Sequence, residues 1–326
     1  MERLKEKSPK PKFAMPHSKS SRFFRALLAV SASAIMLHSA GCSSNNPGTD
    51  SRKGKGETRL DTDDSKKKQD FSGVFKALEK PGKADSSGVA KRELWFESVP
   101  ILMFHNFSST KDSTRYNTSP TEFRSILQKL YNKGHFLVSA REFLENDYSR
   151  LPEGKKPVLL TFDDSYPAQL KFNSDNSISP NCAVGVILDF CKEHPDFGMG
   201  GIFFVIASPF GQPQYEKKKL NLLLDLGFEI GSHSYSHKKF NHLSHEEAEF
   251  QISALDSCLK EALGDRFSEV RYFAYPYGLR GNEDVINSRF KAVFNAIGPL
   301  SKTADKPEFD RFAIPRTETN GKLPRF

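Results

Sequence analysis

Residues 158–165 read Val-Leu-Leu-Thr-Phe-Asp-Asp-Ser, a short apolar run that ends in two adjacent carboxylates. A continuous apolar run of this length is typical of a strand buried on both faces of a parallel sheet. Neighbouring side chains of a strand point in opposite directions, so Asp163 and Asp164 can do different work where the strand ends. One can bind a metal ion while the other takes a proton. Taken alone, the pair is better explained as a solvated turn or a helix cap.

From residue 97 onward, short apolar runs alternate with amphipathic segments on both sides of this stretch. Strands are expected at Val99–Phe104, His135–Val138, Val158–Phe162, Gly201–Ile206, Phe228–Gly231, Arg271–Ala274 and Ala292–Ala296. Helices are expected at Pro120–Lys133, Ala140–Glu145, Cys182–Glu193, Glu216–Leu226, Ser244–Ala262 and Glu283–Arg289. This alternation predicts an α/β fold with a buried parallel sheet, and its six or seven units favour a barrel or a distorted barrel over a Rossmann sheet.

Two further motifs follow expected strands. Residues 231–237 read Gly-Ser-His-Ser-Tyr-Ser-His, which places His233 and His237 four residues apart, a spacing that suits a divalent metal. Residues 273–278 read Phe-Ala-Tyr-Pro-Tyr-Gly, a tight loop that can present a backbone N–H and aromatic faces to a ligand. Alone, each is explained by exposed loop histidines or an ordinary turn. Together with the carboxylate pair, Asp164 and the two histidines form a metal set with open positions, the pattern of catalytic sites.

These three motifs, Thr161–Ser165, Ser232–His237 and Phe273–Gly278, resemble the first three motifs of the NodB-like polysaccharide deacetylases, the family-four carbohydrate esterases. The resemblance covers roughly residues 97–326. It implies a distorted (β/α) barrel and metal-dependent removal of acetyl groups from N-acetylated sugars. By motif, it implies Asp163 as the catalytic base, Asp164, His233 and His237 as metal ligands, the Tyr277 N–H as an oxyanion donor, and Tyr275, Pro276 and Gly278 as substrate-binding residues.

The sequence departs from the family pattern in two places. Ala274 stands where the family usually has an Arg that orients the base, and Arg271, Arg280 or Arg316 could substitute for it. The late Leu-x-His motif, which supplies the general acid, is absent, because no histidine follows His245.

An earlier stretch offers a replacement for that late histidine. Val99–His105 resembles the opening strand of the branch that deacetylates poly-N-acetylglucosamine, in which the barrel is circularly permuted and an early histidine acts instead. The resemblance therefore implies His105 as the general acid. The alternative is a buried histidine at a strand end, bonded to backbone. Residues Phe172–Gly200 are expected to be an insertion beside the site.

The N-terminal segments predict export. A basic stretch, an apolar run from Phe23 to Leu37 and Ser39-Ala40-Gly41-Cys42 form a signal-like leader, residues 1–41, whose end resembles a bacterial lipobox. Cys42 would then be lipidated and anchor the exported protein to a membrane; an uncleaved anchor or an ordinary signal is the alternative. Residues 42–92 are rich in Ser, Gly, Lys and Asp and are expected to be a disordered tether. Residues 93–326 are expected to be the catalytic domain.

The net charge of +8 over 326 residues first suggests a nucleic-acid partner. However, residues 1–26 carry a net +6 and residues 43–92 a net +4, whereas residues 93–326 carry a net −2. We therefore expect no nucleic-acid partner. The family resemblance implies an N-acetylated polysaccharide as the substrate, and we expect a monomer.

Zinc is the metal expected from the ligand types, although cobalt, nickel or iron would suit the same residues. Two other functions stay open. The chain could be a metal hydrolase for another acylated substrate, such as an O-acetylated glycan or a non-sugar amide. It could also be a non-catalytic glycan-binding protein on the same fold.

Overall fold

The computed structural model describes residues 94–109 and 116–326 of the chain. The predicted signal peptide 1–41, the lipidation site Cys42 and the predicted tether 42–92 lie outside the described residues. Within the two described ranges, none of the helices combines the length and the apolar character that crossing a membrane requires.

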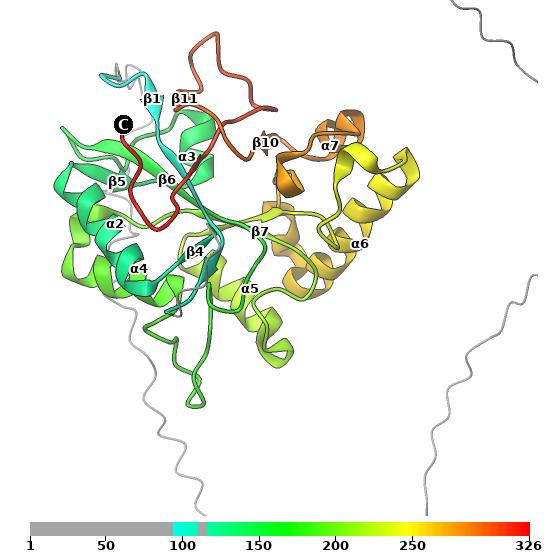
Figure 1. Cartoon of the computed structure of the whole chain (residues 1–326), viewed down its shortest axis with the longest axis horizontal. Helices are drawn as coiled ribbons and strands as arrows, with labels where there is room; N and C mark the ends of the chain where they lie inside the picture. The colour runs from blue at the N-terminus through cyan, green and yellow to red at the C-terminus, as the bar shows by residue number, and fades with distance from the viewer. Residues whose placement is uncertain (1–93, 110–115) are drawn as a thin grey trace, which may run out of the picture. The chain divides into compact units, whose positions relative to one another are not determined.

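A parallel sheet forms the centre of the fold (Figure 1). Its strands are β2 (Ile101–Phe104), β5 (His135–Leu137), β6 (Lys156–Phe162), β7 (Ile202–Val205), β8 (Glu229–Ser232), β9 (Tyr272–Ala274), β10 (Ala292–Phe294) and β12 (Thr317–Glu318). They lie in the order β10-β9-β8-β7-β6-β2-β12, with β5 also paired to β6, and every pair is parallel. The predicted α/β fold is confirmed, with the sheet curled into a half-barrel.

The strands are apolar on both faces because both faces of the sheet are covered. On β2, Leu102 and Phe104 join one hydrophobic cluster, whereas Ile101 joins another on the opposite face. The same alternation holds on β6, where Leu160 and Leu159 belong to the two different clusters. This two-sided burial explains why the strands read as continuous apolar runs rather than as alternating ones.

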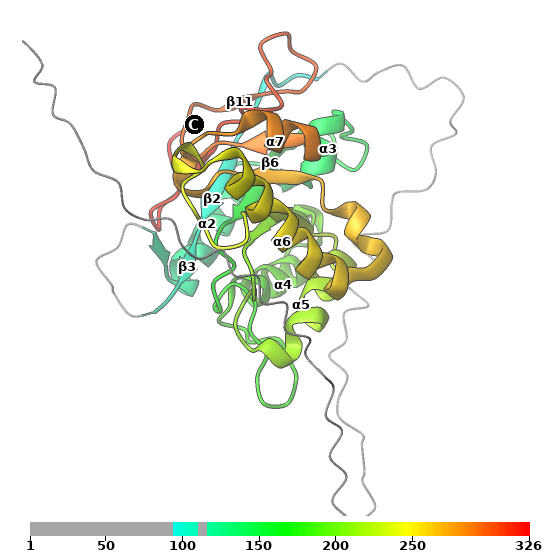
Figure 2. The same cartoon turned by 90° about the vertical axis from the view of Figure 1, so that its right-hand side faces the viewer.

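Helices cover the sheet. They are α2 (Pro120–Asn132), α3 (Ala140–Glu145), α4 (Ala183–Glu193), α5 (Glu216–Asp225), α6 (His245–Leu263) and α7 (Glu283–Arg289). Apolar side chains of α2, α4, α5 and α6 share one cluster with one face of the sheet. Helix α2 contacts α4, and α5 contacts α6, which faces the viewer in Figure 2. A capping box begins α6, because Ser244 and Glu247 each accept a hydrogen bond from the other's backbone N–H.

The predicted strands and helices are confirmed to within two residues at their ends. The structure adds short elements that the sequence did not reveal: β1 (Ser98–Val99), β3 (Asn106–Phe107), β4 (Asn117–Thr118), β11 (Ser301–Lys302), β12 and several single-turn 3-10 helices. Of these, β12 matters for function, because it lies beside β2 at the edge of the site.

The expectation that Phe172–Gly200 is an insertion was wrong for most of its length. Helix α4 lies within this range, and its side chains at Ile187 and Phe190 are fully buried against the central sheet. It contacts α2 and completes the helix layer, so it belongs to the fold itself. An apolar helix of 11 residues is a core element, and only the turns that precede it extend outward from the sheet.

Candidate active site

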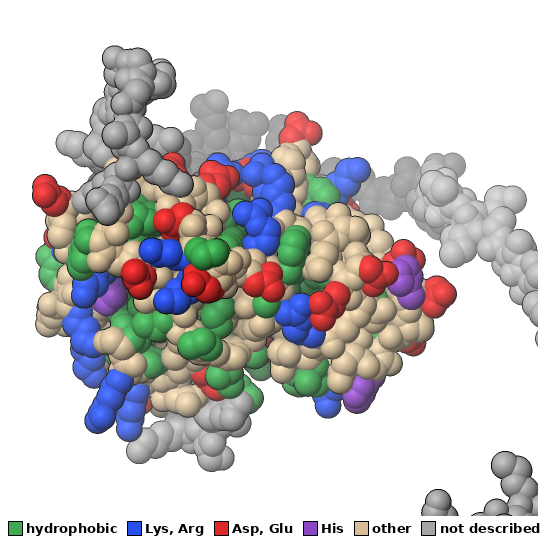
Figure 3. Space-filling model, turned by 90° about the horizontal axis from the view of Figure 1, so that it is seen from above, with side chains coloured by type: hydrophobic (Ala, Val, Ile, Leu, Met, Phe, Trp, Pro, Cys, Tyr) green, Lys and Arg blue, Asp and Glu red, His purple; other side chains and the backbone are tan. Residues whose placement is uncertain are grey.

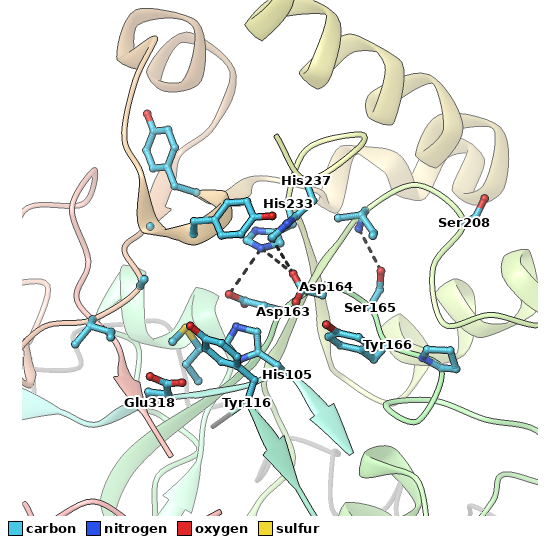
Figure 4. Close-up of a pocket in the computed structure, with 18 of the residues that line it drawn as sticks. His105, Tyr116, Asp163, Asp164, Ser165, Tyr166, Ser208, His233, His237 and Glu318 are labelled. Carbon is cyan, nitrogen blue, oxygen red and sulfur yellow. Dashed lines mark hydrogen bonds and ion pairs between the residues drawn. The ribbon is translucent and has the colours of Figure 1, made fainter. Parts of the chain in front are cut away.

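The three sequence motifs meet at one edge of the sheet. Asp163 and Asp164 follow β6, His233 follows β8, and the loop with Tyr277 follows β9. Parallel strands bring their carboxyl ends together, which is where ligand sites of α/β folds form. A cavity of about 650 Å³ opens at this edge (Figure 4). Its walls include Met103, His105, Tyr116, Asp163, Asp164, Tyr166, Ile206, His233, His237, Tyr275, Tyr277, Gly278, Ile297 and Glu318.

Asp164, His233 and His237 form a compact set of possible metal ligands. One ligand atom of each lies within 4.8 Å of the others. The Asp164 Oδ1 lies 3.3 Å from the His233 Nε2 and 3.0 Å from the His237 Nε2 (Figure 4). The His233 Nδ1 lies 2.7 Å from the Ala274 carbonyl oxygen, to which it donates its proton, so Nε2 is left for a metal. Two imidazoles and one carboxylate suit a divalent ion with open positions.

The charge balance around Asp164 favours a ligating carboxylate. Burial raises the pKa of Asp164, but hydrogen bonds from His233 and His237 outweigh burial and hold that pKa below its ordinary value. Burial also lowers the pKa of His233, and the charges of Asp163 and Asp164 more than reverse this. An ionised carboxylate is the form that binds a cation.

Asp163 is buried and is held by Arg316. The two guanidinium nitrogens of Arg316 donate to the two carboxylate oxygens of Asp163, at 2.6 and 2.8 Å. Arg316 also donates to the Asn295 carbonyl and the Thr161 hydroxyl, and its side chain is fully buried. Burial raises the pKa of Asp163, but the Arg316 charge, together with His233, holds it below its ordinary value. Arg316 therefore makes the contact with Asp163 that is expected of the family arginine, whose position in this sequence is taken by Ala274.

The other two candidate arginines have different partners. The Arg271 Nε donates to the Ser268 carbonyl, and Arg280 pairs with Glu283. Neither is bonded to Asp163. Of the three candidates that the sequence left open, the structure brings only Arg316 to Asp163.

His105 lies directly beside Asp163. Phe104 on β2 pairs with Phe162 on β6, so the residues that follow them are neighbours, and the Asp163 N–H donates to the Phe104 carbonyl at 2.9 Å. The His105 ring lines the cavity and contacts the Tyr116 ring, with centroids 4.9 Å apart. Burial lowers the pKa of His105, and the charges of Asp163 and Asp164 oppose this only in part.

The loop after β9 forms the wall beside His237. The Tyr277 side chain is 59% exposed, and its ring lies 4.5 Å from the His237 ring by centroid. Gly278 lines the cavity at φ +67°, where a Cβ would lie 2.5 Å from the Ala296 side chain. Tyr275 also lines the cavity, although its ring is buried against Phe273. Pro276 is buried and does not line the cavity.

Backbone strain is concentrated in these motifs. Five non-glycine residues of the three motifs have left-handed backbones: Asp164, Ser165, Ser234, His237 and Tyr277, with φ between 47° and 68°. Each such conformation costs about 1–3 kcal/mol and persists only where the surrounding structure enforces it. The strain therefore supports a functional role for this edge of the sheet.

Several cavity residues were not predicted. Tyr116, Tyr166, Ile206, Ile297 and Glu318 line the walls. Tyr166 directly follows the first motif and could have been noticed there. The others come from loops and short strands whose sequences carry no local signal.

The surface carries both signs of charge. On the face shown in Figure 3, Lys and Arg side chains are interspersed with Asp and Glu side chains. Residues 93–326 have a net charge of −2, so the charge distribution of this part of the chain does not favour a polyanion such as nucleic acid.

Comparison with known proteins supports an enzyme of known type. A family model described as polysaccharide deacetylase matches residues 150–297. The chitooligosaccharide deacetylase of Azorhizobium caulinodans is 28% identical over 173 residues, which cover 52% of this chain and 68% of that protein.

Two solved structures share the fold. The Streptococcus pyogenes deacetylase PplD, in complex with acetate, aligns with a TM-score of 0.52 and 18% identity, over 68% of this chain and 92% of that one. A polysaccharide deacetylase from Bacillus cereus aligns with a TM-score of 0.50 and 16% identity, over 68% of this chain and 65% of that one. The family resemblance seen in the three motifs is confirmed at the level of a domain, and so is the predicted enzyme class: this chain contains a polysaccharide deacetylase domain, matched over residues 150–297, and is a hydrolase of that type.

Proposed function

We propose that this chain is a metal-dependent hydrolase that removes N-acetyl groups from an envelope or extracellular polysaccharide containing N-acetylglucosamine. One observation carries the proposal. A metal-ligand set, Asp164 with His233 and His237, shares a cavity with an ionised carboxylate, Asp163, and an imidazole, His105. Hydrolysis of an amide needs a base for water and an acid for the amine, and the cavity offers both. The name of the Azorhizobium relative supports an oligosaccharide of acetylated sugars.

Asp164, His233 and His237 would hold the metal, with zinc the expected ion and cobalt, nickel or iron as alternatives. When bound, such an ion would polarise the acetyl carbonyl and lower the pKa of a water molecule. The His233 hydrogen bond to the Ala274 carbonyl would orient the ligand ring.

The protein side chains would then move two protons. Asp163 takes a proton from the water as the water oxygen attacks the acetyl carbon, and Arg316 keeps this carboxylate ionised and oriented. The backbone N–H of Tyr277 donates to the oxyanion that forms. His105 gives a proton to the amine as the carbon–nitrogen bond breaks, which yields acetate and a free amino sugar. Because burial lowers the pKa of His105, its protonated form is a stronger acid than free imidazolium.

The cavity walls suit a sugar chain. Tyr116, Tyr166 and Tyr277 expose aromatic faces around the proposed metal site. Tyr275 and Gly278 would border the acetyl group, and Pro276 would fix the loop that carries them. Aromatic rings pack against the apolar faces of sugar rings, while their hydroxyl groups remain available for hydrogen bonds.

We further propose that the protein is exported and held at a bacterial membrane by a lipid on Cys42, and that it acts as a monomer. Support comes from the signal-like segment before Cys42 and from the basic, apolar-poor stretch after it. Labelling cells with a clickable fatty acid tests this part. Loss of label in Cys42→Ser is expected, and an unlabelled wild type would contradict it.

The decisive experiment is an acetate-release panel with purified protein and added zinc. We expect acetate from N-acetylglucosamine oligomers but not from acetylated xylan. Release from xylan alone would instead favour an O-acetyl esterase. Bound metal with no acetate from any glycan would favour a glycan-binding protein.

A further inference from the structure

The buried side chain of Gln169 connects the two residues that are proposed to move protons. Gln169 is fully buried in the turn that follows the first motif. Its Nε2 donates one hydrogen bond to the His105 carbonyl at 2.8 Å and a second to the Asp163 carbonyl at 2.6 Å. Both acceptors can only accept, so they require the amide nitrogen, rather than its oxygen, to face them.

The two carbonyls belong to adjacent strand ends. His105 follows β2 and Asp163 follows β6, each one residue beyond the last paired position of its strand. Beyond that position, the Gln169 side chain joins the two backbones through its hydrogen bonds to the His105 and Asp163 carbonyl oxygens. Among the described residues, no other side-chain hydrogen bond reaches both positions.

Gln169 is itself fixed by its backbone. Its N–H donates to the Tyr166 carbonyl at 2.9 Å, and its own carbonyl accepts from the Val184 N–H at 3.1 Å. Val184 lies in the first turn of α4. The backbone that carries the Gln169 side chain is therefore held in place by hydrogen bonds, which a residue that fixes the distance between two others requires.

We propose that Gln169 is a positioning residue that sets the separation of His105 and Asp163, and hence of the acid and the base, across the cavity. This inference rests on the proposed function. Gln169 does not line the cavity, so it acts through the two backbones and not on the substrate. Proton transfer depends steeply on such separations, and a displacement of about 1 Å can lower a rate by about 100-fold.

The test is Gln169→Met in the full chain, since Met keeps the length of the side chain and removes both donors. We expect kcat on N-acetylglucosamine oligomers to fall about 10- to 100-fold, with KM and zinc affinity within about threefold of wild type. Gln128→Met is the matched control, because this amide bonds only to Asn132 on the outside of α2. An unchanged kcat in Gln169→Met, with an active wild type, would overturn this inference alone. An inactive wild type would overturn both proposals.

A double-mutant cycle separates positioning from a general loss of structure. In a His105→Ala background, Gln169→Met should lower kcat by several-fold less than in the wild type, because one of its two targets no longer acts. An equal loss in both backgrounds would contradict the proposal. If Gln169→Met does not fold, Gln169→Asn decides, since it keeps the amide but shortens its reach. Its kcat should lie well below that of wild type, and a wild-type value would overturn the proposal.

Discussion

The two sides of the cavity are built in different ways. On one side, Asp163, Asp164, His233 and His237 come from two contiguous motifs and are tied together by short contacts between their side chains. On the other side, the cavity is lined by His105, Tyr116 and Glu318, which are the residue after β2, the residue before β4, and a residue of β12. The first side can be read from local sequence. The second exists only because the sheet order places β2 between β6 and β12.

This contrast implies different sensitivities. On the side formed by the two motifs, any substitution of a proposed metal ligand or of the proposed base should abolish activity, because each of these groups acts on the reacting atoms in the proposed mechanism. On the side formed by the sheet order, substitutions should lower activity without abolishing it, because these residues supply proton donation and substrate contact.

The largest effect is expected for His233→Ala. This change removes one of the three proposed ligands and leaves the partly buried Asp164 without one of its two imidazole partners. Both bound zinc and activity should be lost, with activity at least about 1,000-fold below wild type. Mass spectrometry of the metal and an acetate assay measure the two losses. His242→Ala, at an exposed histidine, is the control, and full zinc content in His233→Ala would contradict the ligand assignment.

The second largest loss of activity is expected for a substitution of Asp163, the proposed base. Asp163→Asn keeps the shape of the side chain and removes its ability to take a proton. We expect zinc content to stay near wild type while kcat falls about 100- to 10,000-fold. A single-turnover acetate assay with parallel metal analysis measures both. Full activity would remove Asp163 from the role of base.

On the other side of the cavity, His105→Ala should lower kcat about 100-fold and leave zinc content unchanged. The loss should shrink for substrates with better leaving groups, such as an activated aryl acetate, because these need no protonated amine. Comparing the amide and the aryl ester in the same variant measures this. A wild-type rate on the amide would overturn the role of the early histidine, and with it the predicted link to the permuted branch.

A smaller effect is expected for Arg316→Lys, which connects the two sides. Lysine keeps the charge beside Asp163 but cannot reproduce the two parallel hydrogen bonds. We expect kcat to fall about tenfold, with unchanged zinc content. Arg311→Lys, an exposed arginine nearby, should retain full activity. Arg316→Met should in addition lower the free energy of unfolding by about 3–5 kcal/mol, because it leaves a buried carboxylate unpaired. Denaturant titration measures that loss.

The smallest effect on activity is expected for His135→Leu, outside both sides. Burial lowers the pKa of His135 to about 4, so between pH 6.5 and 4 the unfolded chain binds a proton that the folded chain does not. Stability must therefore fall as pH falls through this window, by up to about 3 kcal/mol for this group. Denaturant titrations at pH 7 and pH 4.5 should show a smaller loss in the variant. An equal loss in both proteins would contradict the assignment.

Most of the fold could be predicted from the sequence. Its strands are continuous apolar runs and its helices carry caps and apolar faces, so both have local signals. The metal-ligand set could also be predicted, because each motif directly follows a strand. The short strand β12 could not, because two polar residues, Thr317 and Glu318, show no periodicity. Pairing with β2 is what makes them a strand.

The sequence by itself determined the α/β class, the family resemblance, and which side chains are proposed as metal ligands and as the base. All of these depend on neighbours within a few residues. Only the tertiary structure decided that Arg316 and not Arg271 or Arg280 holds Asp163, and that one buried amide reaches both His105 and Asp163. The physical reason is distance along the chain. Arg316 lies 153 residues from its partner, and only the order of the strands brings two such segments within 2.6 Å.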